Sequence, residues 1–569
     1  MEFETPVTIL LTIPIIGCPG AVGPPARFAT AFGGGRGRVS TLRPFSRLRA
    51  RSAAPMYASA QTLDLLAPFG AALGNPEVAG RQIVRAMAEN AFFPNGNLAG
   101  RGICPGVSEW ILFVVYCSPC SLRKSEENMK VPLIKTSLPG PKASEFIRAD
   151  AEFVSPSYTR AYPLVVEKAL GLWVQDVDGN QFLDFTAGIA VNSTGHCHPE
   201  VVEAIRDQAG KLIHMSGTDF YYSPQTILAQ KLAEIANMTG GAKVFFGNSG
   251  AEAVEASFKL ARYHTRREQM IAFFGAFHGR TMGALSLSAS KAYQKKYYHP
   301  FVPGITHVPY PNCYRCPYGA CYPTCGSACV RWIEDPLFRN SIPPEEVAAI
   351  FVEPIQGEGG YIVPPPEFHV ELGKLAKKYG ILLVADEIQS GMGRTGKMFA
   401  MEHFGVEPDI MALAKGIASG MPLGAMIARA EIMDWHAGSH ASTFGGNPVS
   451  CRAALVTIDL LQKGLIENAE IRGRQLMAGL SEMQKGFECM GDVRGKGLMV
   501  GVELVKDRIT KESAPDLRDL VVQSAFHSGL LLLGCGENTI RFCPALTISE
   551  EEIDTGLSIF EQTLKKLAC

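Results

Sequence analysis

The sequence predicts an α/β protein with one large domain, built on a mostly parallel sheet, and a smaller α+β domain at the C-terminus. Three observations support this prediction. The chain has 569 residues, 47% of them hydrophobic and 19% charged, which is enough for about two to four globular domains. After residue 199, short apolar runs alternate with helix-like stretches. From about residue 454 the pattern returns to helices and short strands.

The predicted elements follow one another in a simple order. Alternating segments on either side of Asp178, Gly179 and Asn180 predict a β-hairpin. Continuous apolar runs then predict strands at residues 242–246, 270–274, 348–352, 381–385 and 424–427. Helix-like segments lie between them, for instance at residues 252–264 and 366–378, and the glycines of residues 494–497 predict a turn. Because continuous apolar strands separated by helices are typical of a parallel sheet covered on both faces, we expect that architecture for the large domain.

The first 128 residues differ in composition from the rest of the chain. They contain eleven arginines and one lysine, whereas residues 129–569 contain 19 arginines and 23 lysines. No sustained apolar periodicity runs through them, so we expect a non-native or disordered extension, with translation starting at Met129. An organellar transit leader is the alternative, because no acidic residue lies between Glu4 and Asp64 while seven arginines fall from Arg27 to Arg51.

We expect residues 129–200 to form the N-terminal segment of the small domain, residues 201–453 the large domain, and residues 454–569 the C-terminal small domain. The formal net charge of −1 gives no basic face for nucleic acid. The apolar runs of the leader are far shorter than the roughly 20 residues of a bilayer helix, so we expect no membrane partner. The 15 cysteines, an odd number, fit a reducing compartment. We therefore expect a cytoplasmic location, or an organellar matrix if the Arg-rich leader is genuine.

Polar groups follow several of the predicted strands, and ligands of open α/β sheets bind at such strand ends. Ser249 and Gly250 join a strand to a helix, where free backbone N–H groups suit a phosphate. A plain N-cap followed by Glu252 is the alternative there. Asp386 follows the strand at 381–385 and could pair with a cationic ligand atom, although Asp is common at strand ends.

A lysine and an aromatic residue complete the set of polar and aromatic candidates. Lys415 lies in an apolar setting, where desolvation lowers the pKa of an amine and makes it nucleophilic, unless the side chain extends to the surface. Phe277 and Arg280 follow the strand at 270–274 and offer a ring face and a guanidinium, with a core Phe and a surface Arg as the alternatives. A phosphate loop, an aromatic ring, a carboxylate and a lysine are together the groups that a pyridoxal phosphate site requires.

In the order of these groups the chain resembles the class III aminotransferases, a fold-type I pyridoxal-phosphate family, and most closely their 4-aminobutyrate aminotransferase branch. The resemblance runs from about residue 135 to residue 567 and is most specific at residues 384–396 and 414–416. It implies a fold-type I architecture, pyridoxal 5′-phosphate as the cofactor, and an active unit that is a homodimer or a higher even oligomer.

The resemblance also implies roles for the residues at matching positions. Lys415 would bind the cofactor covalently and then move the proton between the substrate and cofactor carbons, while Asp386 would pair with the pyridinium nitrogen. The other implied cofactor contacts are Phe277 on the ring face, Gln389 on the phenolic oxygen, Ser249, Gly250 and Ala251 around the phosphate, and Thr443 reaching a neighbouring subunit's phosphate.

Substrate recognition follows from the same resemblance. Arg541 resembles the arginine that binds an α-carboxylate, and its bidentate fork suits that group. Glu358 resembles a gate residue, which pairs with this arginine while an ω-amino donor is bound and leaves it to admit 2-oxoglutarate. Arg280 is the candidate for the distal carboxylate. The expected reaction moves the amino group of an ω-amino acid, 4-aminobutyrate as the first choice, to 2-oxoglutarate in two half-reactions.

Other activities use the same machinery. Ornithine and acetylornithine aminotransferases are alternatives within the family. Residues 134–141 are similar to archaeal relatives, some of which are broad-range amino-acid racemases. Racemisation is therefore a further alternative.

Five cysteines lie within 17 residues, at positions 313, 316, 321, 325 and 329. Thiolates at this density can bind zinc or an iron–sulfur cluster. Their spacing fits no common zinc finger, and aminotransferase chemistry requires no metal there, so we expect a reduced surface loop without metal. A non-enzymatic, metal-binding interaction protein that retains the fold is a remote alternative, against which the joint presence of Lys415, Asp386 and Arg541 argues.

Overall fold

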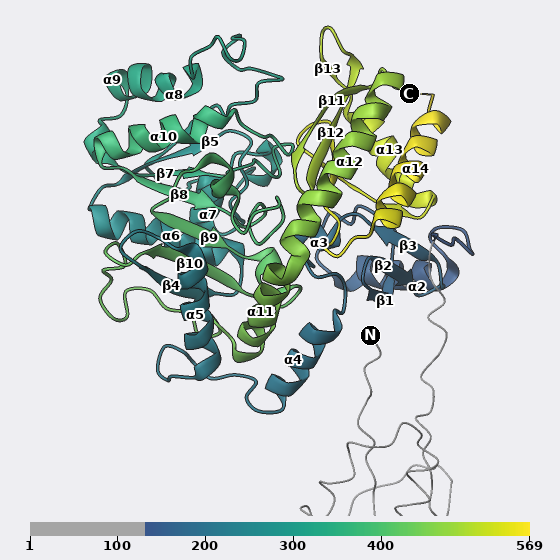
Figure 1. Ribbon diagram of the computed structural model, residues 1–569, viewed down its shortest axis with the longest axis horizontal. Coiled ribbons are helices and arrows are strands. Elements are labelled where there is room, and N and C mark those ends of the chain that lie inside the picture. The colour runs from purple at the N-terminus through teal and green to yellow at the C-terminus, as the bar shows by residue number, and fades with distance from the viewer. Residues whose placement is uncertain (1–130, 569) are drawn as a thin grey trace, which may run out of the picture. The chain divides into compact units, whose positions relative to one another are not determined.

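The computed structural model describes residues 131–568. The extension 1–128 and the expected start at Met129 therefore lie outside the described residues. Within residues 131–568 the chain forms one seven-stranded sheet and two smaller sheets, joined by helices (Figure 1). No helix of this part is both long enough and apolar enough to cross a membrane.

The seven-stranded sheet confirms the predicted mostly parallel architecture. Its strands, in spatial order, are β4 Ala242–Gly247, β10 Gly424–Arg429, β9 Ile410–Leu413, β8 Leu382–Asp386, β7 Val347–Val352, β5 Gln269–Phe273 and β6 Ile305–Val308. β10 is antiparallel to both of its neighbours, and the other pairs are parallel. The five predicted strands are β4, β5, β7, β8 and β10. The sequence did not predict β6 and β9 as strands, because each has only four residues and is defined by pairing with its neighbours.

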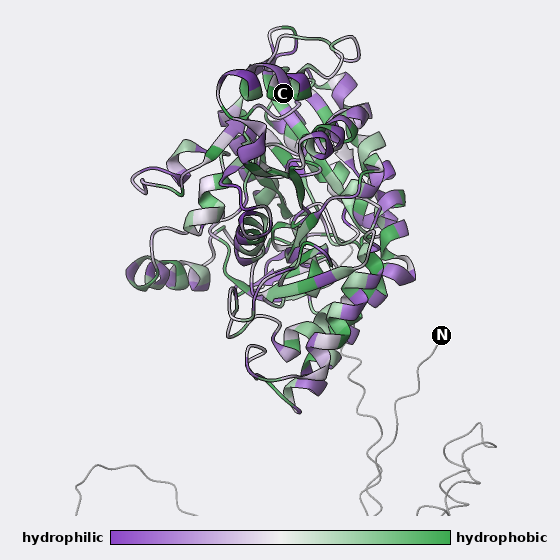
Figure 2. Ribbon diagram, turned by 90° about the vertical axis from the view of Figure 1, so that its left-hand side faces the viewer, coloured by the Kyte–Doolittle hydropathy of each residue, from purple (hydrophilic) through white to green (hydrophobic). Residues whose placement is uncertain are grey.

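Burial on both faces explains why the strands of this sheet are continuously apolar. Ile350 and Val352 of β7 pack in one core cluster, while Phe351 between them packs in the other. The side with Phe351 is covered by α6 Gly250–Thr265 and α7 Met282–Leu287. The other side is covered by α5 Ser223–Ala236, α10 Pro366–Tyr379 and α11 Pro448–Leu460. Figure 2 shows the hydrophobic strands inside and the hydrophilic residues on the outer helix surfaces.

The rest of the described chain forms two small sheets with their helices. One has the order β1 Val166–Leu170, β2 Trp173–Asp176, β3 Gln181–Asp184 and β14 Leu530–Leu531. The other has the order β11 Met490–Lys496, β12 Met499–Asp507, β16 Thr539–Phe542 and β15 Leu533–Cys535, with β13 Glu512–Ser513 beside β12. The helices here are α12 Ile466–Gly486, α13 Pro515–His527 and α14 Glu550–Lys566. β14 pairs in parallel with β3, so segments from both ends of the described chain share a sheet.

Five further α-helices lie in the described chain. They are α2 Pro141–Phe153, α3 Ala187–Ala190, α4 Pro199–Ala209, α8 Ala328–Trp332 and α9 Phe338–Asn340. The predicted hairpin is confirmed: β2 and β3 pair antiparallel, and Gly179 between them has φ +86°. The Asp176 carboxylate accepts the backbone N–H groups of Asp178 and Asn180, which fixes the turn.

The predicted turn at residues 494–497 is mostly wrong. Arg494 and Gly495 lie within β11, and only Gly497, with φ +52°, lies in the connection to β12. A Cβ atom on Gly495 would lie 2.5 Å from the carbonyl oxygen of Met499 on the paired strand. Gly495 is therefore required by the close approach of two strands, a reason that a sequence pattern does not distinguish from a turn.

We predict that Gly473→Ala destabilises the fold, because α12 lies directly against the connection between β11 and β12. A Cβ atom on Gly473 would lie 2.2 Å from the Gly497 carbonyl oxygen. Displacing one backbone should lower the free energy of unfolding by about 1–3 kcal/mol, which a thermal melt would detect.

Gly486→Ala is the matched control, because Gly486 is exposed at the end of the same helix and its Cβ would meet nothing within 4 Å. Since Ala favours a helix more than Gly, this variant should melt at the same temperature or higher. Equal melting temperatures of the two variants would contradict the role given to Gly473.

Candidate active site

The fold brings the candidate groups to one edge of the large sheet. Because β10 runs antiparallel between β4 and β9, the strands β4, β5, β7, β8 and β9 all end at the same edge. β8 ends at Asp386, Lys415 follows the end of β9, Ser249 follows β4, and Phe277 follows β5. The register sets these ends side by side, with Asp386 opposite Ala412 and Val352 opposite Ala385.

Asp386 is held by a buried histidine. His278 Nδ1 lies 2.6 Å from Asp386 Oδ2, and the backbone N–H of Ile388 donates to Asp386 Oδ1. Both side chains are almost completely buried. Burial alone lowers the pKa of His278, but the hydrogen bond and charge of Asp386, together with the Glu353 charge, outweigh it and raise that pKa. The pairing fixes the orientation of the Asp386 carboxylate while leaving it able to face a cationic ligand atom.

Glu353 is a second buried carboxyl in the same place. It follows the end of β7 and accepts the backbone N–H groups of Gly357, at 3.1 Å, and Phe277, at 3.4 Å. Burial raises the pKa of Glu353 to about 7, with the Asp386 charge adding to the effect and the His278 charge opposing it. The carboxyl therefore gains a proton near neutral pH, and in either form it holds together the loops that follow β5 and β7.

Lys415 begins the short turn Lys415–Ala418 and has an unusual backbone conformation, with φ +45°. Burial lowers the pKa of its amine, and the positive charge of Arg541 lowers it further, while the charges of Asp386 and Glu353 oppose the change. A lysine in this setting has more of its amine in the neutral, nucleophilic form than a lysine in water has at the same pH. Burial of the amine argues against the alternative of a lysine extended to the surface.

The start of α6 offers free N–H groups beside this edge. Ser249 is the N-cap, and its hydroxyl accepts the N–H of Glu252 at 3.3 Å. Gly250 and Ala251 form the first turn, where backbone N–H groups have no acceptor within the helix. The close approach of β10 requires glycine at its first residue, because a Cβ on Gly424 would lie 2.2 Å from the Ser249 carbonyl oxygen. Ser249 can therefore act as the N-cap of α6 while the N–H groups of the first turn remain available to a phosphate, so the two interpretations are compatible.

Three other predicted residues are Gln389, Arg280 and Thr443. The Tyr361 hydroxyl donates to Gln389 Oε1 at 2.8 Å, which orients the Gln389 amide. The Arg280 guanidinium lies 5.3 Å from the centroid of the Phe277 ring, and Arg280 is exposed. Thr443 is also exposed and lies after β10, in the loop that precedes α11.

A buried arginine from the small sheets faces the same lysine. Arg541 lies on β16, and its Nη1 is 3.3 Å from Glu358 Oε2. The other carboxylate oxygen of Glu358 lies 3.0 Å from the Lys291 amine. Although burial alone lowers the pKa of Arg541, the nearby Tyr361, Cys535 and Glu358 raise it, so the guanidinium stays charged. The contact is compatible with the predicted gate role of Glu358, and we call this position of its carboxylate closed.

The residues present fit pyridoxal phosphate. Lys415 supplies a desolvated amine that can bind an aldehyde, and Asp386 supplies a fixed carboxylate for a protonated ring nitrogen. The first turn of α6 supplies N–H donors for a phosphate, and Gln389 supplies an amide for a phenolic oxygen. The side chain of Lys415 is only partly covered by protein, which leaves surface for a cofactor to cover.

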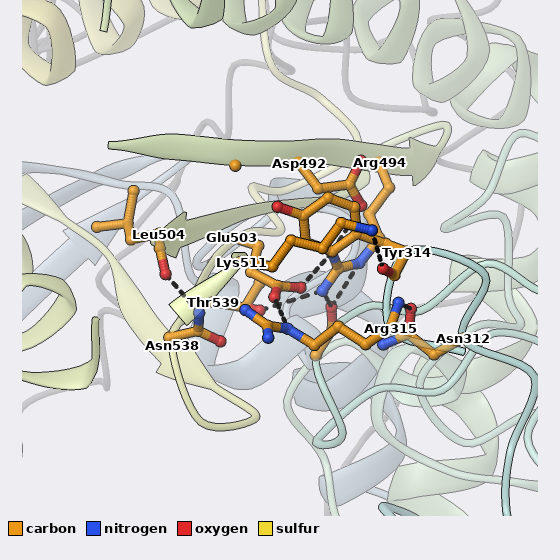
Figure 3. A network of polar contacts seen from close by, with 12 residues as sticks. Asn312, Tyr314, Arg315, Asp492, Arg494, Glu503, Leu504, Lys511, Asn538 and Thr539 are labelled. Atoms are coloured by element: carbon orange, nitrogen blue, oxygen red, sulfur yellow. Dashed lines mark hydrogen bonds and ion pairs between the residues drawn. The ribbon is translucent and has the colours of Figure 1, made fainter. Parts of the chain in front are cut away.

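The cysteine cluster lies in the loop between β6 and α8, with Cys329 in α8 itself. Cys313, Cys316, Cys325 and Cys329 line a cavity of about 170 Å³, and burial raises the pKa of Cys329 to about 11. Within residues 131–568, no three His, Cys, Asp or Glu side chains are arranged to hold a metal ion. The same loop contacts the small sheets through an ion pair of Arg315 with Glu503 (Figure 3).

Sequence reasoning missed several residues of the site. His278 stands in a segment that we had singled out, but nothing in the sequence pairs it with Asp386 across 108 residues. Glu353, Tyr361 and Lys291 were missed for the same reason, since each acts through a partner distant in the sequence. The only available signal was the position of Glu353 directly after an apolar run.

Known proteins resemble the chain over this whole region. The sequence profile of the family described as aminotransferase class-III matches residues 154–564. The chain is 42% identical to the alanine/serine racemase of Pyrococcus horikoshii, over 77% of this chain and 93% of the relative. It is 38% identical to a probable 4-aminobutyrate aminotransferase of Bacillus subtilis, over 73% and 96%. A solved (S)-enantioselective omega-transaminase from Thermomicrobium roseum has a TM-score of 0.70 and 33% identity, over 75% of this chain and 99% of that one.

The lowered pKa of Lys415 predicts how the protein without cofactor captures added pyridoxal phosphate. Because only the neutral amine attacks an aldehyde, the capture rate should rise with pH and level off with a midpoint below the ordinary 10.5 of a lysine. Stopped-flow absorbance measures this rate.

The reference is the same titration with a free lysine derivative blocked at its α-amine, since it shares any titration of the aldehyde itself. A protein midpoint at or above that of the reference would show that Lys415 is not desolvated. Lys415→Ala should abolish the saturable phase.

Proposed function

The chain belongs to the class III aminotransferase family, which uses pyridoxal 5′-phosphate, and from this premise we propose that it transfers the amino group of 4-aminobutyrate to 2-oxoglutarate. The products would be a semialdehyde and glutamate. The observation that carries this proposal is the contact of Arg541 with Glu358, at 3.3 Å. It occupies the guanidinium that an α-carboxylate would otherwise bind.

The closed position of Glu358 favours a donor of one chemical type. An amine whose reacting carbon carries no carboxylate can bind while Glu358 stays on Arg541. An α-amino acid or a 2-oxo acid needs the guanidinium, so Glu358 must leave it first. ω-Amino acids have their carboxylate at the far end of the chain. Arg280, beside the Phe277 ring, supports recognition of that distal carboxylate.

The proposed chemistry divides among residues that lie along the sheet edge. Pyridoxal phosphate, when bound, supplies an aldehyde that takes up the amine and a ring that accepts the electrons left when a proton leaves the adjacent carbon. Lys415 would hold the cofactor and, once released from it, move that proton as a neutral amine. Asp386, oriented by His278, would keep a proton on the ring nitrogen. Phe277 and Gln389 would hold the ring and its phenolic oxygen in place.

We also propose that the active unit is a homodimer or a higher even oligomer. Phe444, next to Thr443, exposes 61% of its surface, and Tyr221 is fully exposed. Large exposed aromatic residues beside a site residue favour a covering partner. Sedimentation of the purified protein should therefore give the mass of at least two chains, and a monomer at the concentrations used for activity assays would contradict this. We further propose a cytoplasmic location, or an organellar matrix if the Arg-rich leader is genuine.

Racemisation of an α-amino acid is a second candidate, favoured by the 42% identity to the Pyrococcus alanine/serine racemase. Racemisation uses the same lysine and carboxylate but returns the proton to the carbon that lost it. Such a substrate carries an α-carboxylate, so Glu358 would have to leave Arg541 for every substrate. Ornithine and acetylornithine, whose reacting carbon is remote from the α-carboxylate, are further alternatives within the transaminase class.

An amino-donor panel with the purified holoenzyme distinguishes these candidates. With 2-oxoglutarate as acceptor, we expect 4-aminobutyrate to give glutamate faster than ornithine, acetylornithine or L-alanine do. A parallel incubation with one L-amino acid and no oxo acid, followed by chiral chromatography, tests the second candidate. Sustained racemisation over many turnovers, without glutamate formation from 4-aminobutyrate, would overturn the proposed function in favour of a racemase.

A further inference from the structure

The Glu358 carboxylate contacts two cations at once. Its Oε2 lies 3.3 Å from Arg541 Nη1 and its Oε1 lies 3.0 Å from Lys291 Nζ. The two cations differ in burial, because the Arg541 side chain is 7% exposed and the Lys291 side chain is 28% exposed. Lys291 precedes the turn Ala292–Gln294 of the large domain, whereas Arg541 belongs to β16. Glu358 therefore bridges two parts of the fold.

The main chain around Glu358 is held on both sides. The N–H of Gly536 donates to the Glu358 carbonyl at 2.6 Å. The Gly360 carbonyl accepts two N–H groups from Arg494, at 2.7 and 3.1 Å. Arg494 is itself fixed by Asp492 and Glu503, as Figure 3 shows. A change in the position of the Glu358 carboxylate therefore has to come from rotation of its side chain.

The neighbours of Glu358 leave little else that can move. A Cβ on Gly357 would lie 2.5 Å from Gln389 Nε2, and one on Gly359 would lie 2.2 Å from Gln356 Oε1. A Cβ at either position would therefore displace the end of a glutamine side chain. Glu358 is the one residue of the segment 357–360 that has a side chain. Its rotation between Arg541 and Lys291 needs no other side chain of the segment to move.

The Glu358 carboxylate has a different set of partner cations in each of its two positions. When a substrate α-carboxylate takes Arg541, a partly buried Glu358 without another cation would be left unpaired, which is unfavourable. Lys291 already touches the carboxylate and can keep it paired. In the closed position Arg541 still pairs with Glu358. The loss of Lys291 should therefore destabilise the closed position less than the open position, in which Glu358 has left Arg541.

We propose that Lys291 is the positioning residue that holds Glu358 when Arg541 binds a substrate α-carboxylate, and so sets the ease with which the site changes between its two substrate types. This inference rests on the proposed function insofar as the site accepts two classes of substrate. It also applies to a racemase, whose substrates need Arg541 throughout. Lys291 thereby determines the affinity for α-carboxylates without contacting them.

Lys291→Met in the full-chain holoenzyme tests this proposal. The probes are 2-methylalanine, which has an α-carboxylate, and 2-methyl-2-aminopropane, which has neither that carboxylate nor a distal one. Neither amine has an α-hydrogen to lose, so dissociation constants come from the absorbance change of the bound cofactor without turnover. We expect the variant to weaken the binding of 2-methylalanine about three- to tenfold and to leave the binding of 2-methyl-2-aminopropane within about twofold.

Two further variants serve as controls. Lys296→Met removes an exposed lysine five residues along the chain and should change neither constant. Lys291→Arg keeps a cation beside Glu358 and should retain most of the affinity for 2-methylalanine. If Lys291 acted only through the packing of its methylene chain, Lys291→Met would retain that affinity as well.

Two results would overturn the proposal. Unchanged binding of 2-methylalanine by Lys291→Met would show that Glu358 needs no second cation. Weaker binding confined to 4-aminobutyrate, with 2-methylalanine unaffected, would make Lys291 a ligand of the distal carboxylate instead. Failure of 4-aminobutyrate as a donor for the unmodified enzyme would overturn the proposed function, yet the two dissociation constants would still be measurable and would decide the role of Lys291 separately.

Discussion

The large sheet is buried on both faces, and this burial fixes the places where its strands end. Residues such as Ile350, Phe351 and Val352 pack alternately into two separate clusters, so a shift of one strand along its neighbour would disturb both cores. The fixed register of the strands therefore also fixes the positions of Asp386 and of the residues after β5, β7 and β9. The candidate residues that follow these strands depend on this common edge, because the proposed chemistry needs a carboxylate and an amine at fixed positions around one ring.

Buried charges at this edge are stable only because they are compensated. Asp386 has His278, and Arg541 has Glu358, so neither charged group is buried alone. Glu353 follows a different route: burial raises its pKa to about 7, so it takes up a proton near neutral pH. Lys415 has no carboxylate within ion-pair distance among the described residues, and burial lowers its pKa. In the proposed function, Lys415 is the group whose reactivity would be used.

The second part of the site comes from the small sheets. Arg541 on β16 pairs with Glu358, and Arg494 on β11 donates to the Gly360 carbonyl in the loop that contains Glu358. In the proposed function, substrate recognition would be shared between two sheets, whereas the cofactor contacts would come from the large one. This division would let one segment, Glu358 with its glycine neighbours, respond to the substrate while the residues that hold the cofactor stay fixed.

Local patterns in the sequence were sufficient for the strands β4, β5, β7, β8 and β10 and for the hairpin at Gly179, because each depends on neighbours close in the chain. They failed at β6 and β9, which have four residues each, and at Gly495, where a glycine needed for strand contact resembles a turn. The partnerships of His278 with Asp386, Tyr361 with Gln389, and Lys291 with Glu358 join residues 28 to 108 positions apart. By itself the sequence determined the candidate residues at the strand ends; only the tertiary structure decided which of them meet, because pairing, burial and pKa are set by atoms that the folded sheets bring together from distant segments.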